Sequence, residues 1–282
     1  KKYDFTFISY LLLMSEGIKK QAKIINADNL NNKSKIINGF GLNPKLKKRY
    51  NFFCSLQQKK NHSPFSGGTF IGKNVVVTTA HSVEFMNKQN LIVSFNKRHV
   101  NAPGMRFRVR RIVIHPRFNP ITLNHDIALL FLTQFPNRRI KKKINKIKKI
   151  FLSRPRLNKF LYKHHRKSII LGYGKIKQNG GLSKKLRASN IKIMKTSETN
   201  YSPSLFTKNM ILAGDYNDIN DPNDNEDTCQ GDSGGPLFTH FRRKRFLIGI
   251  TSWGNGCALD NYPGVYTKVS HYRRWIKNVA RI

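Results

Sequence analysis

Ser233 is the residue whose surroundings in the sequence best fit chemistry. It lies in the segment Asp227-Thr-Cys-Gln-Gly-Asp-Ser-Gly-Gly-Pro236, after an aspartate and before two glycines. A serine hydroxyl is a poor nucleophile unless a base accepts its proton and hydrogen-bond donors hold the oxyanion that forms on attack. Gly231 has no side chain to block its N–H, so this group and the N–H of Ser233 can form such an oxyanion hole. Taken alone, the segment fits an ordinary turn of small residues equally well.

Two further segments contain a base and an acid. Val75–Ser82 has the pattern of a buried strand that ends at His81, and Asp126 stands just ahead of the apolar run Ile127–Leu132. His81 can accept the Ser233 proton and return it to a leaving amine, while Asp126 stabilises the imidazolium. A single histidine or aspartate is more often structural, but here all three members occur within motifs of their own. His125 is expected to be a bystander, because adjacent strand residues point to opposite faces.

Together the three motifs resemble those of the trypsin-like (chymotrypsin-fold) serine proteases, with the order His, Asp, Ser. The resemblance covers roughly Ile36 to the C-terminus and implies secreted, extracellular hydrolysis of peptide bonds. It implies no cofactor. No metal site is predicted either, because the acidic stretch around Asp227 lacks the glycine turn of an EF-hand-type calcium loop.

The resemblance also implies a substrate specificity. It places Asp227 at the floor of the S1 pocket, with Ser252, Trp253 and Gly254 on one wall and Gly264 on the other. A carboxylate in a narrow, partly dry pocket favours a cationic side chain, since a buried charge without a partner is costly. Protein or peptide substrates with Lys or Arg at P1 are therefore expected. Asp227 also lies within a cluster of acidic residues, so membership of an acidic loop is the competing interpretation.

An activation junction is expected between Lys35 and Ile36, where Ser34-Lys-Ile-Ile-Asn-Gly39 resembles the site at which the family is cleaved. By resemblance, the new Ile36 ammonium would fold inward and pair with Asp232. This pairing would order the oxyanion hole and the S1 pocket. Asn38 stands at a position where glycine is usual, which can strain the backbone.

Cysteine usage departs from the family. By resemblance, Cys229 and Cys257 form a disulfide beside the S1 pocket, whereas the bridge that normally flanks the catalytic histidine is replaced by Ser66 and Ser82. Cys54 has no remaining partner and lies in an apolar stretch, so we expect a buried small hydrophobic residue rather than a reactive thiol.

Short apolar runs between Gly, Pro and Asn turns predict an all-β protein. The resemblance implies two packed six-stranded antiparallel β-barrels, and apolar residues at three- and four-residue spacing predict a C-terminal α-helix over residues 270–282 with Ser270 as its N-cap. The N-terminal barrel is expected over about 36–137 and the C-terminal barrel over about 150–269. The strands expected from the apolar runs are Thr69–Val77, Leu91–Phe95, Phe107–Ile114, Ile127–Leu132, Ser168–Leu171 and Phe246–Ser252.

Residues 1–35 fit neither barrel and are interpreted as a signal or pro-segment. Phe5–Met14 is an apolar run behind two lysines, which has the size of a signal-peptide core and is too short to span a bilayer. No transmembrane segment is therefore expected. A pro-segment with a chance apolar patch is the alternative.

The net charge of +39 is the other anomaly. Arg138–Lys149 and Arg242–Arg245 are dense basic runs that could bind a heparin-like polyanion, although compositional drift explains them as well. Ile140, Ile144 and Ile147 could give the first run one apolar helical face. No nucleic-acid-binding signature accompanies the charge, and a monomer is expected.

The leading hypothesis for the whole chain is an active endopeptidase. The alternative is a non-catalytic or weakly active homologue that serves as a regulatory, polyanion-binding module.

Overall fold

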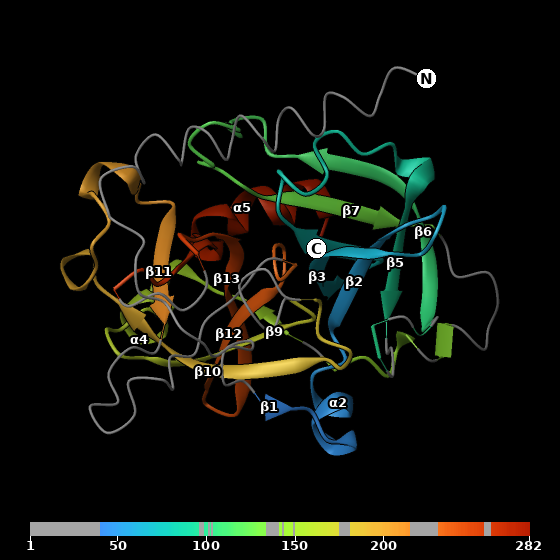
Figure 1. Ribbon diagram of the computed structural model, residues 1–282, viewed down its shortest axis with the longest axis horizontal. Coiled ribbons are helices and arrows are strands. Elements are labelled where there is room, and N and C mark those ends of the chain that lie inside the picture. The colour runs from blue at the N-terminus through green and yellow to red at the C-terminus, as the bar shows by residue number, and fades with distance from the viewer. Residues whose placement is uncertain are drawn as a thin grey trace. The chain divides into compact units, whose positions relative to one another are not determined.

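The structure is a computed structural model, and it describes residues 40–95, 99–100, 102, 104–133, 141–142, 144–148, 150–174, 181–214, 231–256 and 261–282. All of them belong to one compact unit, Ser34–Ile282. Two groups of strands make up most of this unit (Figure 1). Each group closes into a six-stranded antiparallel barrel, as the sequence predicts.

The first barrel closes in the order β2-β3-β4-β7-β6-β5. Its strands are β2 (Phe53–Gln58), β3 (Pro64–Gly72), β4 (Val75–Thr78), β5 (Leu91–Phe95), β6 (Met105–Ile114) and β7 (Ala128–Leu132). In β6 the alternation of Phe107 and Val109 with arginines turns the apolar side chains inward and leaves the arginines exposed. The interior of this barrel is filled by side chains such as Leu56, Phe95 and Leu130.

The single strand expected over Thr69–Val77 is wrong, because β3 and β4 form a hairpin there. Lys73 and Asn74 adopt left-handed φ values of 46° and 60°, the conformation of a tight two-residue hairpin turn. The apolar pattern runs on across the turn, so hydrophobicity alone did not indicate the reversal.

The second barrel consists of β9 (Lys167–Gly172), β10 (Arg187–Met194), β11 (Met210–Gly214), β14 (Gly264–Lys268), β13 (Lys244–Trp253) and β12 (Pro236–Phe241). β12 pairs back with β9 and β9 with β10, which closes the ring. Two short strands extend it: β1 (Phe40–Gly41) pairs with β10, and β8 (Phe151–Leu152) lies parallel to β13. The remaining helices are short: α2 (Pro44–Arg49), α4 (Asn158–Leu161), and the 3-10 turns η1 (Lys88–Asn90), η2 (Pro155–Leu157), η3 (Thr196–Glu198) and η4 (Pro203–Leu205).

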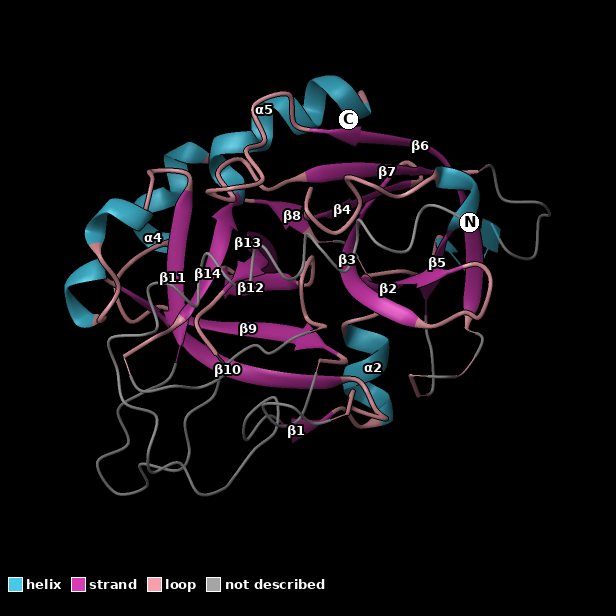
Figure 2. Cartoon of the chain, turned by 45° about the horizontal axis from the view of Figure 1, so that its top comes forward, coloured by secondary structure: helices cyan, strands magenta, loops and turns pink. Residues whose placement is uncertain are grey.

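The C-terminal helix α5 spans Val269–Ala280 and lies alongside β7 in both views (Figures 1 and 2). Its buried residues Tyr272, Ile276 and Ala280 recur every four positions and pack into a core that both barrels share. Ser270 is not the N-cap, as expected from the sequence, because the helix begins one residue earlier and Lys268 takes that position. The residue after the helix, Arg281, adopts a left-handed φ of 53°, as is common at helix ends.

One apolar core continues from the first barrel into the second. Phe52 of the first barrel and Phe238 of β12 pack edge to face with ring centroids 5.3 Å apart, and Tyr50 packs against both. Each fully buried aromatic side chain contributes roughly 1.5–3 kcal/mol relative to exposure. The two barrels are therefore held together by burial, which fixes the residues at their junction.

Candidate active site

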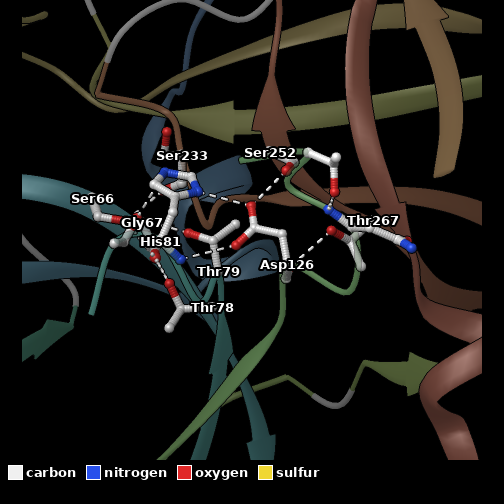
Figure 3. A network of polar contacts seen from close by, with 12 residues as sticks. Ser66, Gly67, Thr78, Thr79, His81, Asp126, Ser233, Ser252 and Thr267 are labelled. Carbon is white, nitrogen blue, oxygen red and sulfur yellow. Dashed lines mark hydrogen bonds and ion pairs between the residues drawn. The ribbon is translucent and has the colours of Figure 1, made fainter. Parts of the chain in front are cut away.

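His81 lies in the turn after β4 and is held by Asp126 at two points. Nδ1 of His81 lies 2.8 Å from Oδ2 of Asp126, and the main-chain N–H of His81 donates to Oδ1 at 2.9 Å. The antiparallel register places Thr78 opposite Ala128, so the turn after β4, which contains His81, meets the segment ahead of β7, which contains Asp126. The two bonds fix the ring and keep the proton on Nδ1, which leaves a lone pair on Nε2 (Figure 3).

Asp126 is completely buried and receives further hydrogen bonds from the second barrel. The hydroxyl of Ser252 donates to Oδ2 at 2.5 Å, and the hydroxyl of Thr267 donates to the main-chain carbonyl of Asp126 at 2.8 Å. A buried carboxylate requires such donors. The sequence predicted Ser252 only as part of a pocket wall; its contact with Asp126, like that of Thr267, depends on how the barrels meet.

Opposing effects set the proton affinity of His81. Burial lowers the pKa of His81, but the charge and hydrogen bond of Asp126, with a contribution from Glu84, outweigh it and raise the pKa above its ordinary value. Burial and the proximity of Asp126 raise the pKa of Glu84 in turn. Glu84 was missed in the sequence, although it lies only three residues after His81, because proximity in the chain did not show that its charge would act on the imidazole.

Ser233 lies in the turn that leads into β12, and its main-chain carbonyl is fixed to the first barrel. This carbonyl accepts hydrogen bonds from the N–H of Gly67 at 2.7 Å and from the hydroxyl of Ser66 at 2.6 Å. The next N–H, that of Gly234, donates to the carbonyl of Thr251 at 2.8 Å. Ser233, His81 and Asp126 thus come from separate segments and meet in one polar network (Figure 3).

A chain of hydroxyl groups connects Ser233 to His81. The Oγ atoms of Ser66 and Ser82 lie 3.0 Å apart, within hydrogen-bond distance, and Oγ of Ser82 lies 3.3 Å from Nε2 of His81. Thr79 bonds to the same Ser82 hydroxyl at 2.7 Å. Among the described residues, Ser82 rather than Ser233 is the hydroxyl bonded to Nε2. Ser66 and Ser82 are the pair that stands in place of the family's disulfide, and they remain in contact.

The main-chain N–H groups of Gly231 and Ser233 donate to no acceptor among the described residues. Gly231 has a φ of 97°, and a Cβ at this position would lie 2.7 Å from Leu182. Both the conformation and the lack of space therefore require glycine here. The two free donors are the groups from which the sequence predicted an oxyanion hole.

Asp232 is almost completely buried, and its carboxylate lies against Gly172 and Gly174. The N–H of Gly174 donates to Oδ1 at 2.7 Å. A Cβ on either glycine would overlap the carboxylate. Gly172 ends β9, so the second barrel provides a space that fits this side chain. The sequence did not indicate these two glycines.

The predicted walls of the S1 pocket lie close together. A Cβ on Gly254 would lie 3.8 Å from the Cα of Gly264, with no atom nearer. The ring of Trp253 packs against two other aromatic rings. Phe206 stacks on it with ring centroids 5.9 Å apart, and Tyr201 meets it edge to face with ring centroids 5.4 Å apart. Several predicted residues lie outside the described part of the chain: Asp227, Cys229, Cys257, Lys35 and Ile36.

Two residues lie away from this network. Cys54 is buried and free, which confirms the predicted buried position, and burial raises the pKa of its thiol well above the ordinary value. His125 contacts Tyr272 at 3.1 Å and stacks on His115. Its contacts lie outside the network of His81, Asp126 and Ser233, and it precedes β7 rather than lying within a strand.

Comparison with known proteins agrees with this geometry. The Trypsin family model matches residues 40–276. The chain belongs to the trypsin family. It is 31% identical to Trypsin Blo t 3 of Blomia tropicalis over 225 residues, which is 78% of each protein. As a trypsin-family member, it is a serine protease homologue of the hydrolase class. Within the described residues, no helix is both long and apolar enough to cross a membrane.

Proposed function

We propose that this trypsin-family chain is an active endopeptidase in which Ser233 is the nucleophile, His81 the general base and Asp126 the residue that orients His81. The observation that carries the proposal is the two-point contact of buried Asp126 with His81. This contact turns Nε2 of His81 toward the hydroxyl of Ser82. The neighbouring hydroxyl of Ser66 bonds to the main-chain carbonyl of Ser233.

The reaction follows from these positions. Oγ of Ser233 attacks the scissile carbonyl while its proton moves to Nε2 of His81, so Ser82 must release Nε2 when substrate binds. The N–H groups of Gly231 and Ser233 stabilise the oxyanion, and Asp126 stabilises the imidazolium. His81 then protonates the leaving amine, and water hydrolyses the acyl-enzyme by the same route in reverse.

The proposed specificity is for Lys or Arg at P1, with Asp227 as the counter-charge. The support from the described residues is that Gly254 and Gly264, on the predicted walls, add no side chains to the pocket. Asp227 would supply the charge at the floor of the pocket.

The proposed activation is cleavage between Lys35 and Ile36, after which the new ammonium pairs with Asp232. The support is the deep burial of Asp232 next to the oxyanion-hole segment, because a buried carboxylate is stabilised by a cation. Secretion and a Cys229–Cys257 disulfide are part of the same proposal and rest on family membership.

The test uses the purified full-length chain, cleaved after Lys35 and assayed on peptides that differ only at P1. We expect hydrolysis after Arg and Lys, a loss of roughly a thousandfold or more in Ser233→Ala, and loss of the P1 preference in Asp227→Ser. Activity of Ser233→Ala equal to the parent would exclude Ser233 as the nucleophile. A correctly cleaved parent without activity would favour the non-catalytic homologue.

Polyanion binding is a second proposed function, supported by a cluster of cations near α2. Burial lowers the pKa of His240, and the charges of Arg49, Arg245 and Arg166 lower it further. Burial and Arg49 also lower the pKa of Arg245. These positive charges repel one another. The sulfate groups of a heparin-like chain would offset this repulsion by binding between them.

A further inference from the structure

Two histidines and a glutamate meet on the second barrel, in a cluster that the proposed reaction does not use. Nε2 of His164 lies 2.8 and 2.7 Å from the two carboxylate oxygens of Glu198, and Nε2 of His165 lies 3.5 Å from Oε1. One nitrogen or oxygen atom from each residue lies within 4.8 Å of the other two. It is the one such three-residue cluster of His, Cys, Asp and Glu among the described residues.

The backbone brings the two imidazoles to the same side. His164 and His165 occupy the turn Lys163–Arg166, in which the N–H of Arg166 donates to the carbonyl of Lys163 at 2.9 Å. His165 adopts a left-handed φ of 58°, and its N–H donates to Ile193 of β10 at 2.8 Å. The ring centroids are consequently 3.8 Å apart. A residue with a side chain is uncommon in this conformation, and here the conformation turns both Nε2 atoms toward one carboxylate.

Glu198 is fixed independently of the histidines. It ends η3, just beyond β10, and its Oε2 accepts the N–H of Lys195 at 2.7 Å. The carboxylate therefore stays in place if the imidazoles exchange its hydrogen bonds for another ligand. An anchored carboxylate next to two imidazoles is a donor set that transition metals bind.

We propose that His164, His165 and Glu198 bind a Zn²⁺ ion. Zinc–ligand distances of about 2.0–2.2 Å in a tetrahedron require ligand atoms roughly 3.3 Å apart. The observed nitrogen–oxygen separations of 2.7 to 3.5 Å bracket this value, and the three ligand atoms all lie within 4.8 Å of one another, so side-chain rotations can bring them around one ion. Each imidazole binds through the lone pair of a deprotonated Nε2, and any proton displaced from these nitrogens passes to water. Water occupies the fourth position, because the side chains of His164, His165 and Glu198 are 31%, 56% and 29% exposed.

The surroundings select the class of metal. Lys163, Arg166 and Lys167 flank the histidines. Their positive charges disfavour metal ions such as Ca²⁺ and Mg²⁺, which proteins bind mainly through electrostatic attraction to oxygen ligands. Ca²⁺ and Mg²⁺ need several oxygen ligands, and Glu198 is the one carboxylate in the cluster. Zn²⁺ forms strong bonds to neutral imidazole and tolerates this setting better.

A bound ion would link the turn Lys163–Arg166 to the segment after β10. That segment continues to Tyr201 and Phe206, which support Trp253. Binding is therefore expected to stabilise the second barrel against heat, since a ligand that binds only the folded state raises the unfolding temperature.

The test measures Zn²⁺ binding to the metal-free full-length chain by titration calorimetry, with Co²⁺ absorption spectra to report tetrahedral coordination. We expect one ion per chain with micromolar affinity, weakened at least tenfold in His164→Asn and in Glu198→Gln. His99→Asn is the matched control, because His99 is an exposed histidine outside the cluster. Thermal unfolding of each metal-free variant shows whether it is folded.

Equal affinity of the parent and of folded His164→Asn overturns the proposal, as does an equal loss in His99→Asn. So does a Co²⁺ spectrum typical of octahedral coordination. None of these measurements depends on peptide hydrolysis, so the result is independent of the proposed protease activity.

Discussion

His81 experiences opposing effects that determine when it can act as a base. Burial disfavours the imidazolium, whereas Asp126 and, more weakly, Glu84 favour it, and the pKa ends above its ordinary value of 6.5. Only the neutral imidazole can accept the Ser233 proton. The activity of the proposed protease should therefore rise with pH through a midpoint above that value.

The first prediction concerns Glu84. Glu84→Gln removes a negative charge that raises the pKa of His81, so the acidic limb of the kcat/KM profile should move to lower pH. The measurement is the pH dependence of kcat/KM on one peptide substrate. Glu198→Gln, a matched change distant in sequence, should leave the limb in place. An unchanged limb in Glu84→Gln would show that Glu84 does not influence His81.

The second prediction concerns Ser252, whose hydroxyl donates to Oδ2 of Asp126. A hydrogen bond to a charged group contributes roughly 1.5–3 kcal/mol. Ser252→Ala should therefore lower kcat by about tenfold to a hundredfold, with little change in KM, because Asp126 stabilises the imidazolium of the transition state.

Ser189→Ala is the control for Ser252→Ala. Ser189 is also a buried strand serine, but its hydroxyl has no hydrogen-bond partner among the described residues, so its removal should leave kcat unchanged. Comparable losses of kcat in both variants would mean that packing, rather than the bond to Asp126, explains the effect.

At the scale of elements, the end of β9 determines where Asp232 lies. Gly172 has no unusual φ, so alanine fits its backbone, but the added Cβ would overlap the Asp232 carboxylate. Gly172→Ala should displace Asp232, abolish most activity and lower the free energy of unfolding by roughly 1–3 kcal/mol.

Gly41→Ala is the matched control for Gly172→Ala, since Gly41 lies in a strand with no atom within 4 Å of its added Cβ. Peptide hydrolysis and urea unfolding are the measurements. Full activity of Gly172→Ala would show that the position of Asp232 is not required for catalysis.

β3 and the turn after β4 are joined by the Ser66–Ser82 hydrogen bond, with 3.0 Å between the oxygen atoms. The double variant Ser66→Cys/Ser82→Cys should form a disulfide under oxidising conditions. Closing a loop of this size contributes about 3 kcal/mol. Its free energy of unfolding should therefore exceed that of its own reduced form, as measured by urea denaturation. Two free thiols at these positions in the oxidised protein would contradict the prediction.

At the scale of the whole molecule, exposed lysines and arginines form basic surfaces that take no part in the proposed catalytic reaction. In the described part of the run Arg138–Lys149, Ile144 and Ile147 pack into the core, while Lys141, Lys142, Lys146 and Lys148 face solvent. Residues 141, 142 and 144 are helical, in agreement with the predicted apolar face. The β12–β13 turn presents Arg242 and Arg243 to solvent.

The polyanion proposal predicts that Arg242→Gln/Arg243→Gln/Lys244→Gln elutes from heparin at lower salt than the parent, because screened charge attraction drives the binding. Peptide hydrolysis should be unchanged. Lys59→Gln/Lys60→Gln, which alters exposed lysines elsewhere, should elute close to the parent. Elution of the triple variant with the parent would leave compositional drift as the better explanation of this basic turn.

The sequence by itself determined the fold class and the local motifs. Alternation in β6 and the buried run of β4 specify strands, because each pattern matches one way of burying apolar side chains. The segments around His81, Asp126 and Ser233 could be recognised, since their chemistry is encoded within a few residues. The helix limits and the Lys73–Asn74 turn were not predicted correctly. A one-residue shift hardly changes the apolar pattern of a helix, and the apolar pattern of the strands continues across the turn.

Only the tertiary structure decided which side chains meet across the two barrels. The contacts of Ser252 and Thr267 with Asp126, and of Ser66 with Ser233, join residues more than a hundred positions apart. Asp232 beside Gly172 likewise joins two separate elements, the turn before β12 and the end of β9. Such pairs follow from barrel closure and from the shared apolar core, which are properties of the whole chain and leave no local pattern to detect.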